Sequence, residues 1–90
     1  MEKKYSEFTD KLFEAILTLK NVEECYKFFE DICTIKELDA ISQRLMVAKL
    51  LKEGKTFNEI AEISGASSAT ISRVNKCLMY GKGYKSVLKD

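Results

Sequence analysis

Three times along this chain a short polar residue is followed three positions later by glutamate, which is the spacing of a helix-opening capping box. The pairs are Asn21 with Glu24, Thr34 with Glu37, and Thr56 with Glu59. In this motif the first side chain accepts a hydrogen bond from an early backbone N–H, and the glutamate reaches back toward the cap. The chain also has no proline and only four glycines in 90 residues, so few positions break a helix. Together these features predict an all-α fold.

Apolar residues at three- and four-residue steps indicate how far each helix extends. We expect helices over about residues 5–19, 22–33, 35–53, 57–64 and 68–80, with a short final turn over 84–89. Gly54 is expected to stop the third helix in a left-handed conformation. Before it, the apolar residues Leu38, Ile41, Leu45, Ala48 and Leu51 follow at helical steps. At 90 residues the chain has room for one domain.

We divide this single domain, residues 1–90, into four parts. Residues 1–33 are predicted to be two dimerisation helices, 34–54 a central helix, 57–79 a helix-turn-helix and 80–90 a short C-terminal segment. The first two helices carry wide apolar stripes, whereas a small domain offers limited interior in which to bury them. A homodimer would bury these stripes, so we expect one.

Several classes of function are not expected, because the chain lacks the residues that they usually need. The chain has no histidine, and its three cysteines, Cys25, Cys33 and Cys77, lack Cys-x-x-Cys spacing, so neither a metal site nor a disulfide framework is expected. An enzyme is not expected and no catalytic residue is assigned, because Asp31, Glu37 and Asp39 are explained as surface and cap residues. No apolar run approaches the roughly 20 residues that cross a bilayer, and the N-terminus does not read as a signal peptide. We therefore expect a cytoplasmic protein without a membrane partner.

The charges are unevenly distributed. Residues 1–53 carry nine Lys or Arg and eleven Asp or Glu, whereas residues 54–90 carry six and three. No acidic residue lies between Glu62 and Asp90, although five cationic residues do. Such a segment suits contact with phosphate, because each neutralised phosphate releases condensed counterions. The other explanation is an ordinary solvated face, so the motif in this segment has to decide.

That motif is a helix-turn-helix. Ala61 is small where the two helices cross, and Gly65 lies in the turn, where a positive φ is cheap for glycine. Ile60, Ile71 and Val74 are predicted to fill the space between the helices, and Ser67 or Ser68 to cap the second one. The outward residues of the second helix are predicted to be Ser68, Ala69, Thr70, Ser72, Arg73 and Lys76. Small and hydroxyl-bearing groups allow close approach to base edges.

Residues 34–78 resemble the Trp repressor family. Residues 65–73, Gly-Ala-Ser-Ser-Ala-Thr-Ile-Ser-Arg, are similar to the turn and recognition helix of that family, and the Arg-Val-Asn that begins at Arg73 resembles its YerC/YecD-type branch. The resemblance implies an intertwined homodimer of helical subunits that presents two recognition helices to successive major grooves of near-palindromic double-stranded DNA. Within it, DNA-facing positions are occupied by Asn58, Ser68, Ala69, Thr70 and Ser72. We add Ser67 and Arg73 to this set, and Lys76 on its charge.

The resemblance also implies a possible effector pocket. Thr34, Arg44 and Arg73 coincide with family positions that hold an amino-acid ligand. However, Val74 stands where the repressor has glycine, and Cys77 where it has a serine that meets the ligand's amino group. The valine adds bulk and a thiol is a poor hydrogen-bond partner, so L-tryptophan is not expected to bind. No cofactor is assigned, and the effector stays unidentified.

Two functions remain open. The first is a sequence-specific transcriptional regulator, expected to be a repressor, that reads its operator through residues 68–80 of each subunit. The second is a protein-interaction module that keeps the helix-turn-helix corner without binding DNA and meets an acidic partner through its basic C-terminal segment. Binding to a randomised pool of duplexes separates the two, since only the regulator would enrich a sequence.

Overall fold

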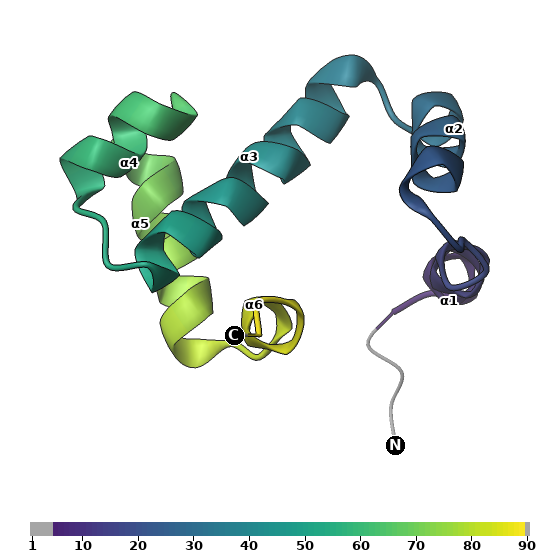
Figure 1. Cartoon of the computed structure of the whole chain (residues 1–90). Coiled ribbons are helices and arrows are strands. Elements are labelled where there is room, and N and C mark those ends of the chain that lie inside the picture. The colour runs from purple at the N-terminus through teal and green to yellow at the C-terminus, as the bar shows by residue number, and fades with distance from the viewer. Residues whose placement is uncertain (1–4, 90) are drawn as a thin grey trace. The chain divides into compact units, whose positions relative to one another are not determined.

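The computed structural model describes residues 5–89, and in that range every regular element is a helix. The helices are α1 Glu7–Ile16, α2 Val22–Ile32, α3 Ile35–Lys52, α4 Phe57–Ser64, α5 Ser68–Tyr80 and α6 Gly83–Val87 (Figure 1). The all-α prediction is therefore confirmed. Residues 1–4 and Asp90, at the two ends of the predicted domain, lie outside the described residues. The chain forms two compact units, residues 1–35 and 36–90, and each is described by itself.

The first unit contains α1 and α2. Helix α1 is shorter than the predicted 5–19, because the Ser6 hydroxyl caps it by accepting from the Thr9 N–H (3.2 Å) and the helix ends at Ile16. The predicted cap at Asn21, at the start of α2, is confirmed: Asn21 Oδ1 accepts from the Glu24 N–H (2.9 Å). The Glu24 carboxylate reaches back to the Lys20 N–H (3.0 Å), one residue before the cap.

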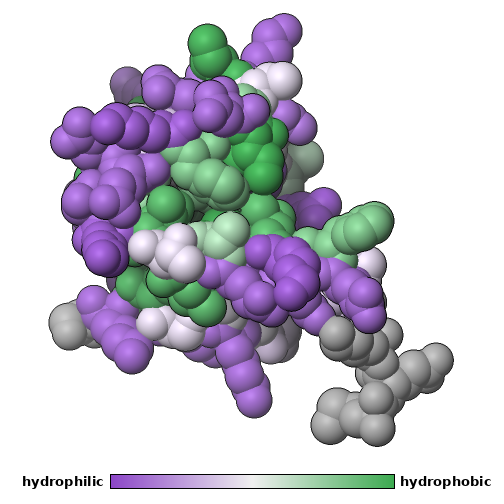
Figure 2. Space-filling view, turned by 90° about the vertical axis from the view of Figure 1, so that its right-hand side faces the viewer, coloured by the Kyte–Doolittle hydropathy of each residue, from purple (hydrophilic) through white to green (hydrophobic). Residues whose placement is uncertain are grey.

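Neither helix of the first unit contains a buried residue. Large apolar side chains stay open to solvent, with Phe8 87% and Leu17 83% exposed. Phe28 and Phe29 form an edge-to-face pair with ring centroids 5.4 Å apart, the geometry that aromatic rings favour. Green apolar side chains are visible at the surface in Figure 2, with purple hydrophilic groups around them. The single chain thus leaves much of its apolar surface uncovered.

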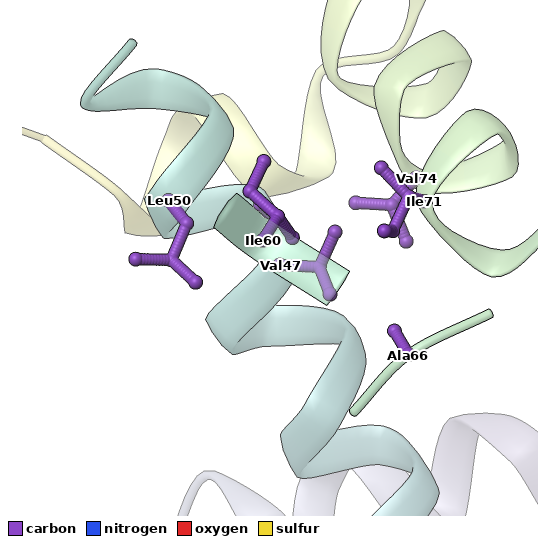
Figure 3. Packing of buried hydrophobic residues seen from close by; sticks show 7 residues of the cluster. Val47, Leu50, Ile60, Ala66, Ile71 and Val74 are labelled. Carbon is purple, nitrogen blue, oxygen red and sulfur yellow. The ribbon is translucent and has the colours of Figure 1, made fainter. Parts of the chain in front are cut away.

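The second unit holds the core. Side chains from α3, α4, the turn and α5 converge in one cluster (Figure 3). Its members are Val47, Ala48, Leu50, Ile60, Ala66, Ile71 and Val74. The predicted roles of Ile60, Ile71 and Val74 are confirmed, since each is at most 1% exposed. Tyr84 and Leu88 from the C-terminal segment pack against this cluster, together with Leu51 and Ala61.

The set of five apolar residues that follow at helical steps along α3 does not face the core of a single chain as a whole. Of its five positions only Ala48 is fully buried, whereas Ile41 and Leu45 are 47% and 44% exposed. The helix instead packs Val47 and Leu50 against α4 and α5. Apolar residues surround the C-terminal half of α3 on several sides, so their spacing did not reveal which side faces the core.

Glycines mark the ends of α3 and α5, and a lysine of α3 holds the C-terminal segment. Gly54 has φ of +85°, which confirms it as the stop of α3. A side chain at Gly81 would place its Cβ 2.7 Å from the Cys77 carbonyl oxygen, so the chain can pass there only as glycine. The Lys52 ammonium donates to the Leu88 carbonyl and so ties the C-terminal segment to α3. No helix within residues 5–89 is long and apolar enough to cross a membrane.

Candidate nucleic-acid interface

The first helix of the predicted helix-turn-helix begins with a complete capping box. Thr56 Oγ1 accepts from the Glu59 N–H (3.2 Å), and Glu59 Oε1 accepts from the Thr56 N–H (3.0 Å). The backbone hydrogen bond from Thr56, and then the one from its side chain, lower the pKa of Glu59, because both favour the charged carboxylate. Helix α4 therefore starts at a defined residue, and the predicted box is confirmed.

The turn between α4 and α5 is held by its own side chains. Gly65 has φ of +72°, as predicted, and its N–H donates to the Ala61 carbonyl (2.9 Å). The Ser64 hydroxyl donates to the Ile60 carbonyl (2.6 Å) and accepts from the Ala66 N–H (3.1 Å). The turn is thus hydrogen-bonded on both sides of the glycine, which sets the direction in which α5 leaves.

Ser67 caps α5. Its hydroxyl accepts from the Thr70 N–H (3.2 Å) and donates to the Thr70 hydroxyl (3.1 Å). The sequence left two residues open as the cap, Ser67 and Ser68, and the structure identifies Ser67. Because the Ser67 hydroxyl is occupied within the chain, Ser67 contributes to this surface mainly by fixing Thr70, which is half-buried.

The remaining predicted DNA-facing residues are exposed. They are Asn58 on α4 and Ser68, Ala69, Ser72, Arg73 and Lys76 on α5. Within residues 5–89, no hydrogen bond or ion pair occupies the side chains of Arg73 and Lys76. No acidic residue follows Glu62 in the described part of the chain. Helix α5 therefore presents hydroxyl groups and unpaired cations without a carboxylate beside them in sequence.

Two of the predicted effector-pocket residues line one slot. Arg44 from α3 and Arg73 from α5 line a slot of about 360 Å³, together with Ala40, Gln43 and Thr70. Val74 does not line the slot, because its side chain lies in the core and is 1% exposed. Thr34 belongs to the first unit, so its place relative to the slot is not described.

Cys77, the remaining pocket residue, lines a neighbouring groove of about 500 Å³. Arg44 borders this groove as well as the slot. The other lining residues are mostly apolar or glycine: Ile41, Leu45, Gly81, Gly83, Tyr84 and Val87. The predicted pocket residues of the second unit therefore lie in three places: a polar slot, an apolar groove and the core. In residues 5–89 no group of three His, Cys, Asp or Glu side chains is arranged to hold a metal ion.

Sequence reasoning missed Gln43. Its Nε2 donates to the Ser64 carbonyl over 3.1 Å and so joins α3 to the turn. The two residues are 21 positions apart, and no local pattern marks such a pair. It missed Ala66 as well, a turn residue that is 6% exposed in the core.

Comparison with known proteins identifies a family and several relatives that this chain resembles over most of its length. The family profile described as Trp repressor protein matches residues 7–90. The chain is 57% identical over 72 residues to the uncharacterized protein YerC of Bacillus subtilis (strain 168), which covers 80% of this chain and 69% of that protein. A crystal structure of a candidate Trp repressor from Staphylococcus aureus superposes with a TM-score of 0.89 and 52% identity, over 93% of this chain and 85% of the other. A TrpR-like protein from Eubacterium eligens ATCC 27750 gives a TM-score of 0.88 and 54% identity, over 91% and 86%.

Proposed function

Because the chain belongs to the Trp repressor protein family, we propose that it is a sequence-specific transcriptional repressor, a cytoplasmic homodimer that reads a near-palindromic operator through α5 of each subunit. The observation that carries this proposal is the surface of α5. Its N-terminal half offers small and hydroxyl-bearing side chains, and its exposed cations, Arg73 and Lys76, have no partner within residues 5–89. Small polar groups suit base edges, whereas unpaired cations suit phosphates.

The geometry of Thr70 supports a role in base reading. Its hydroxyl accepts a hydrogen bond from Ser67, so its own proton is free to be donated outward. The major-groove edges of guanine, adenine and thymine all present acceptors, and the thymine methyl group suits the methyl of threonine. Lys76, six residues further along α5, is assigned to phosphate because a lysine acts there as a point charge.

The proposal of a dimer rests on apolar surface that a single chain leaves uncovered. Helices α1 and α2 contain no buried residue, and the groove along α3 is lined mostly by apolar side chains. Burial of apolar surface stabilises association by roughly 25 cal/mol per Å² before the costs of binding. A second copy of the chain supplies surface of the same character, and two copies present two α5 helices to one duplex.

The experiment that tests the proposal selects bound duplexes from a random pool and then measures affinity at several salt concentrations. We expect the chain to enrich one near-palindromic sequence and its affinity to fall steeply with salt. Thr70→Ala should lose about 1–3 kcal/mol of discrimination at one base position of each half-site. Lys76→Ala should weaken binding to all sequences and reduce the slope of the salt dependence by about 1.

Lys27→Ala is the matched control for the charge change. Lys27 lies on α2, where its Nζ is 3.7 Å from Glu23 Oε1 and both side chains are exposed. We expect this variant to bind DNA as the wild type does. If the pool yields no enriched sequence, the protein-interaction module becomes the better explanation. If both Thr70→Ala and Lys76→Ala bind the selected site as the wild type does, α5 is not the reading helix.

A further inference from the structure

Gln43 caps the end of a helix to which it does not belong. It lies on α3 and is half-buried, and its Nε2 donates to the backbone carbonyl of Ser64 over 3.1 Å. Ser64 is the last residue of α4. The last four carbonyls of a helix have no partner within the helix and need one elsewhere. The side chain of α3 therefore satisfies a group at the start of the turn that leads into α5.

The side-chain amide of Gln43 lies where α3, the turn after α4 and the start of α5 come together. A Cβ built on Gly65 would be 4.0 Å from Gln43 Nε2, so the amide lies beside the turn itself. Gln43 also lines the slot together with Thr70 and Arg73 of α5. The Ser64 hydroxyl continues the connection, because it accepts from the Ala66 N–H directly before the cap of α5. One side chain thus joins α3 to the backbone that fixes where α5 begins.

We propose that Gln43 is a positioning residue, which holds the turn, and through it the N-terminal end of α5, in the orientation that reads base edges. The part of this inference that concerns DNA rests on the proposed function. Hydrogen bonds to base edges require a fixed geometry, whereas contacts between cations and phosphates tolerate small shifts. Loss of the Gln43 donor leaves the Ser64 carbonyl in a half-buried place without its partner. The turn then moves more freely, and base readout suffers before phosphate contact does.

The first measurement needs no DNA. Amide hydrogen exchange is followed in the full chain for wild type and for Gln43→Met, which keeps the length of the side chain but lacks a donor. We expect exchange at Gly65 and Ala66 to become about tenfold faster, because loss of one buried hydrogen bond favours local opening by that order. The core amides of Ile71 and Val74 should change much less. Gln43→Glu, which at neutral pH also lacks a donor, should behave like Gln43→Met.

Ser42→Ala is the matched control for these variants. The Ser42 side chain is exposed, and its hydroxyl donates to the Leu38 carbonyl of its own helix (2.8 Å). The substitution therefore removes a hydrogen bond next to Gln43 without touching the turn. We expect wild-type exchange at Gly65 and Ala66 in this variant.

The second measurement compares affinity for the selected duplex with affinity for a scrambled one at equal salt. Gln43→Met should reduce the ratio about tenfold, while affinity for the scrambled duplex and the salt slope stay as in wild type. An equal rise of exchange in turn and core, or no rise in the turn, would overturn the proposal. A faster turn with an unchanged ratio would overturn it too. If the wild type selects no sequence, the proposed function is wrong, and the exchange data alone decide whether Gln43 holds the turn.

Discussion

Two neighbouring serines lie at the start of the proposed reading helix, and their hydroxyl groups have different roles. The Ser67 hydroxyl bonds to both the backbone and the side chain of Thr70. The Ser68 side chain is exposed and has no hydrogen bond within residues 5–89. The two residues are of the same type and suit a cap equally well, so only the backbone geometry distinguishes them. Ser67 has extended backbone, with φ of −70° and ψ of 160°, whereas Ser68 is already helical.

We expect Ser67→Ala to lower the free energy of unfolding by about 1 kcal/mol, because the first turn of α5 loses a hydrogen bond to its cap. Ser68→Ala should change it by less than about 0.5 kcal/mol, since an exposed side chain is removed without loss of a bond. Urea denaturation of the two variants, followed by circular dichroism, measures both values. Equal losses in the two variants would contradict the assignment of Ser67 as the cap.

The polar slot between α3 and α5 yields a prediction about ligands. Ala40 is the single apolar residue among the five that line it, whereas an indole ring requires apolar walls. We therefore expect L-tryptophan to leave the melting temperature of the full chain unchanged. A ligand that binds only the folded state raises the melting temperature by mass action, so a thermal titration detects binding. A saturating rise that disappears in Arg44→Ala would show that the slot does bind tryptophan.

At the scale of elements, the capping box at Thr56 and Glu59 predicts a dependence of stability on pH. The pKa of Glu59 lies below its usual range in the folded chain, chiefly because the Thr56 N–H donates to its carboxylate. A lowered folded pKa adds stability above the unfolded pKa, about 4.3 for glutamate, and that stability is lost as the pH falls through the folded pKa.

Glu59→Gln isolates this effect, because glutamine can still accept from the Thr56 N–H but does not titrate. We expect wild type to be the more stable protein at neutral pH and the difference to disappear on acidification. Chemical denaturation of both proteins at a series of pH values measures it. A difference that persists far below pH 4 would contradict the role given to the charged carboxylate.

Helix boundaries were predictable where a cap announced them and less so elsewhere. The caps at Asn21 and Thr56 and the glycines Gly54 and Gly65 mark the ends of elements by local chemistry alone. The end of α1 carries no such signal, and the apolar pattern runs on to Leu19, beyond the last helical residue. The buried side of α3 was unpredictable because apolar residues lie on more than one side of it.

The features of the candidate site also divide into those that the local sequence predicts and those that it does not. The exposure of α5 and its lack of carboxylates follow from residues close in sequence, so they were predictable. The bond from Gln43 to Ser64 and the burial of Ala66 depend on how α3 packs against the corner. Such contacts join residues far apart in the chain, and a single sequence does not reveal them.

At the scale of the whole molecule, the apolar surface of the first unit calls for a partner. Phe8 is 87% and Leu17 83% exposed, and Val22 at the start of α2 is 70% exposed. Isolated apolar residues on a surface are ordinary, but two successive helices without a single buried residue are not accounted for by one chain. If a second copy covers them, stability and association become one equilibrium.

That equilibrium makes the melting temperature depend on concentration. We expect it to rise as the protein is concentrated, and sedimentation equilibrium to give twice the mass of the chain at micromolar concentration. Phe8→Ser should shift both measurements toward the monomer, because an exposed ring contributes to association and little to its own helix. Glu7→Ser, next to it on α1, is the control and should remain dimeric. A single-chain mass with a constant melting temperature would mean that each subunit meets DNA alone, and the operator would then have no reason to be palindromic.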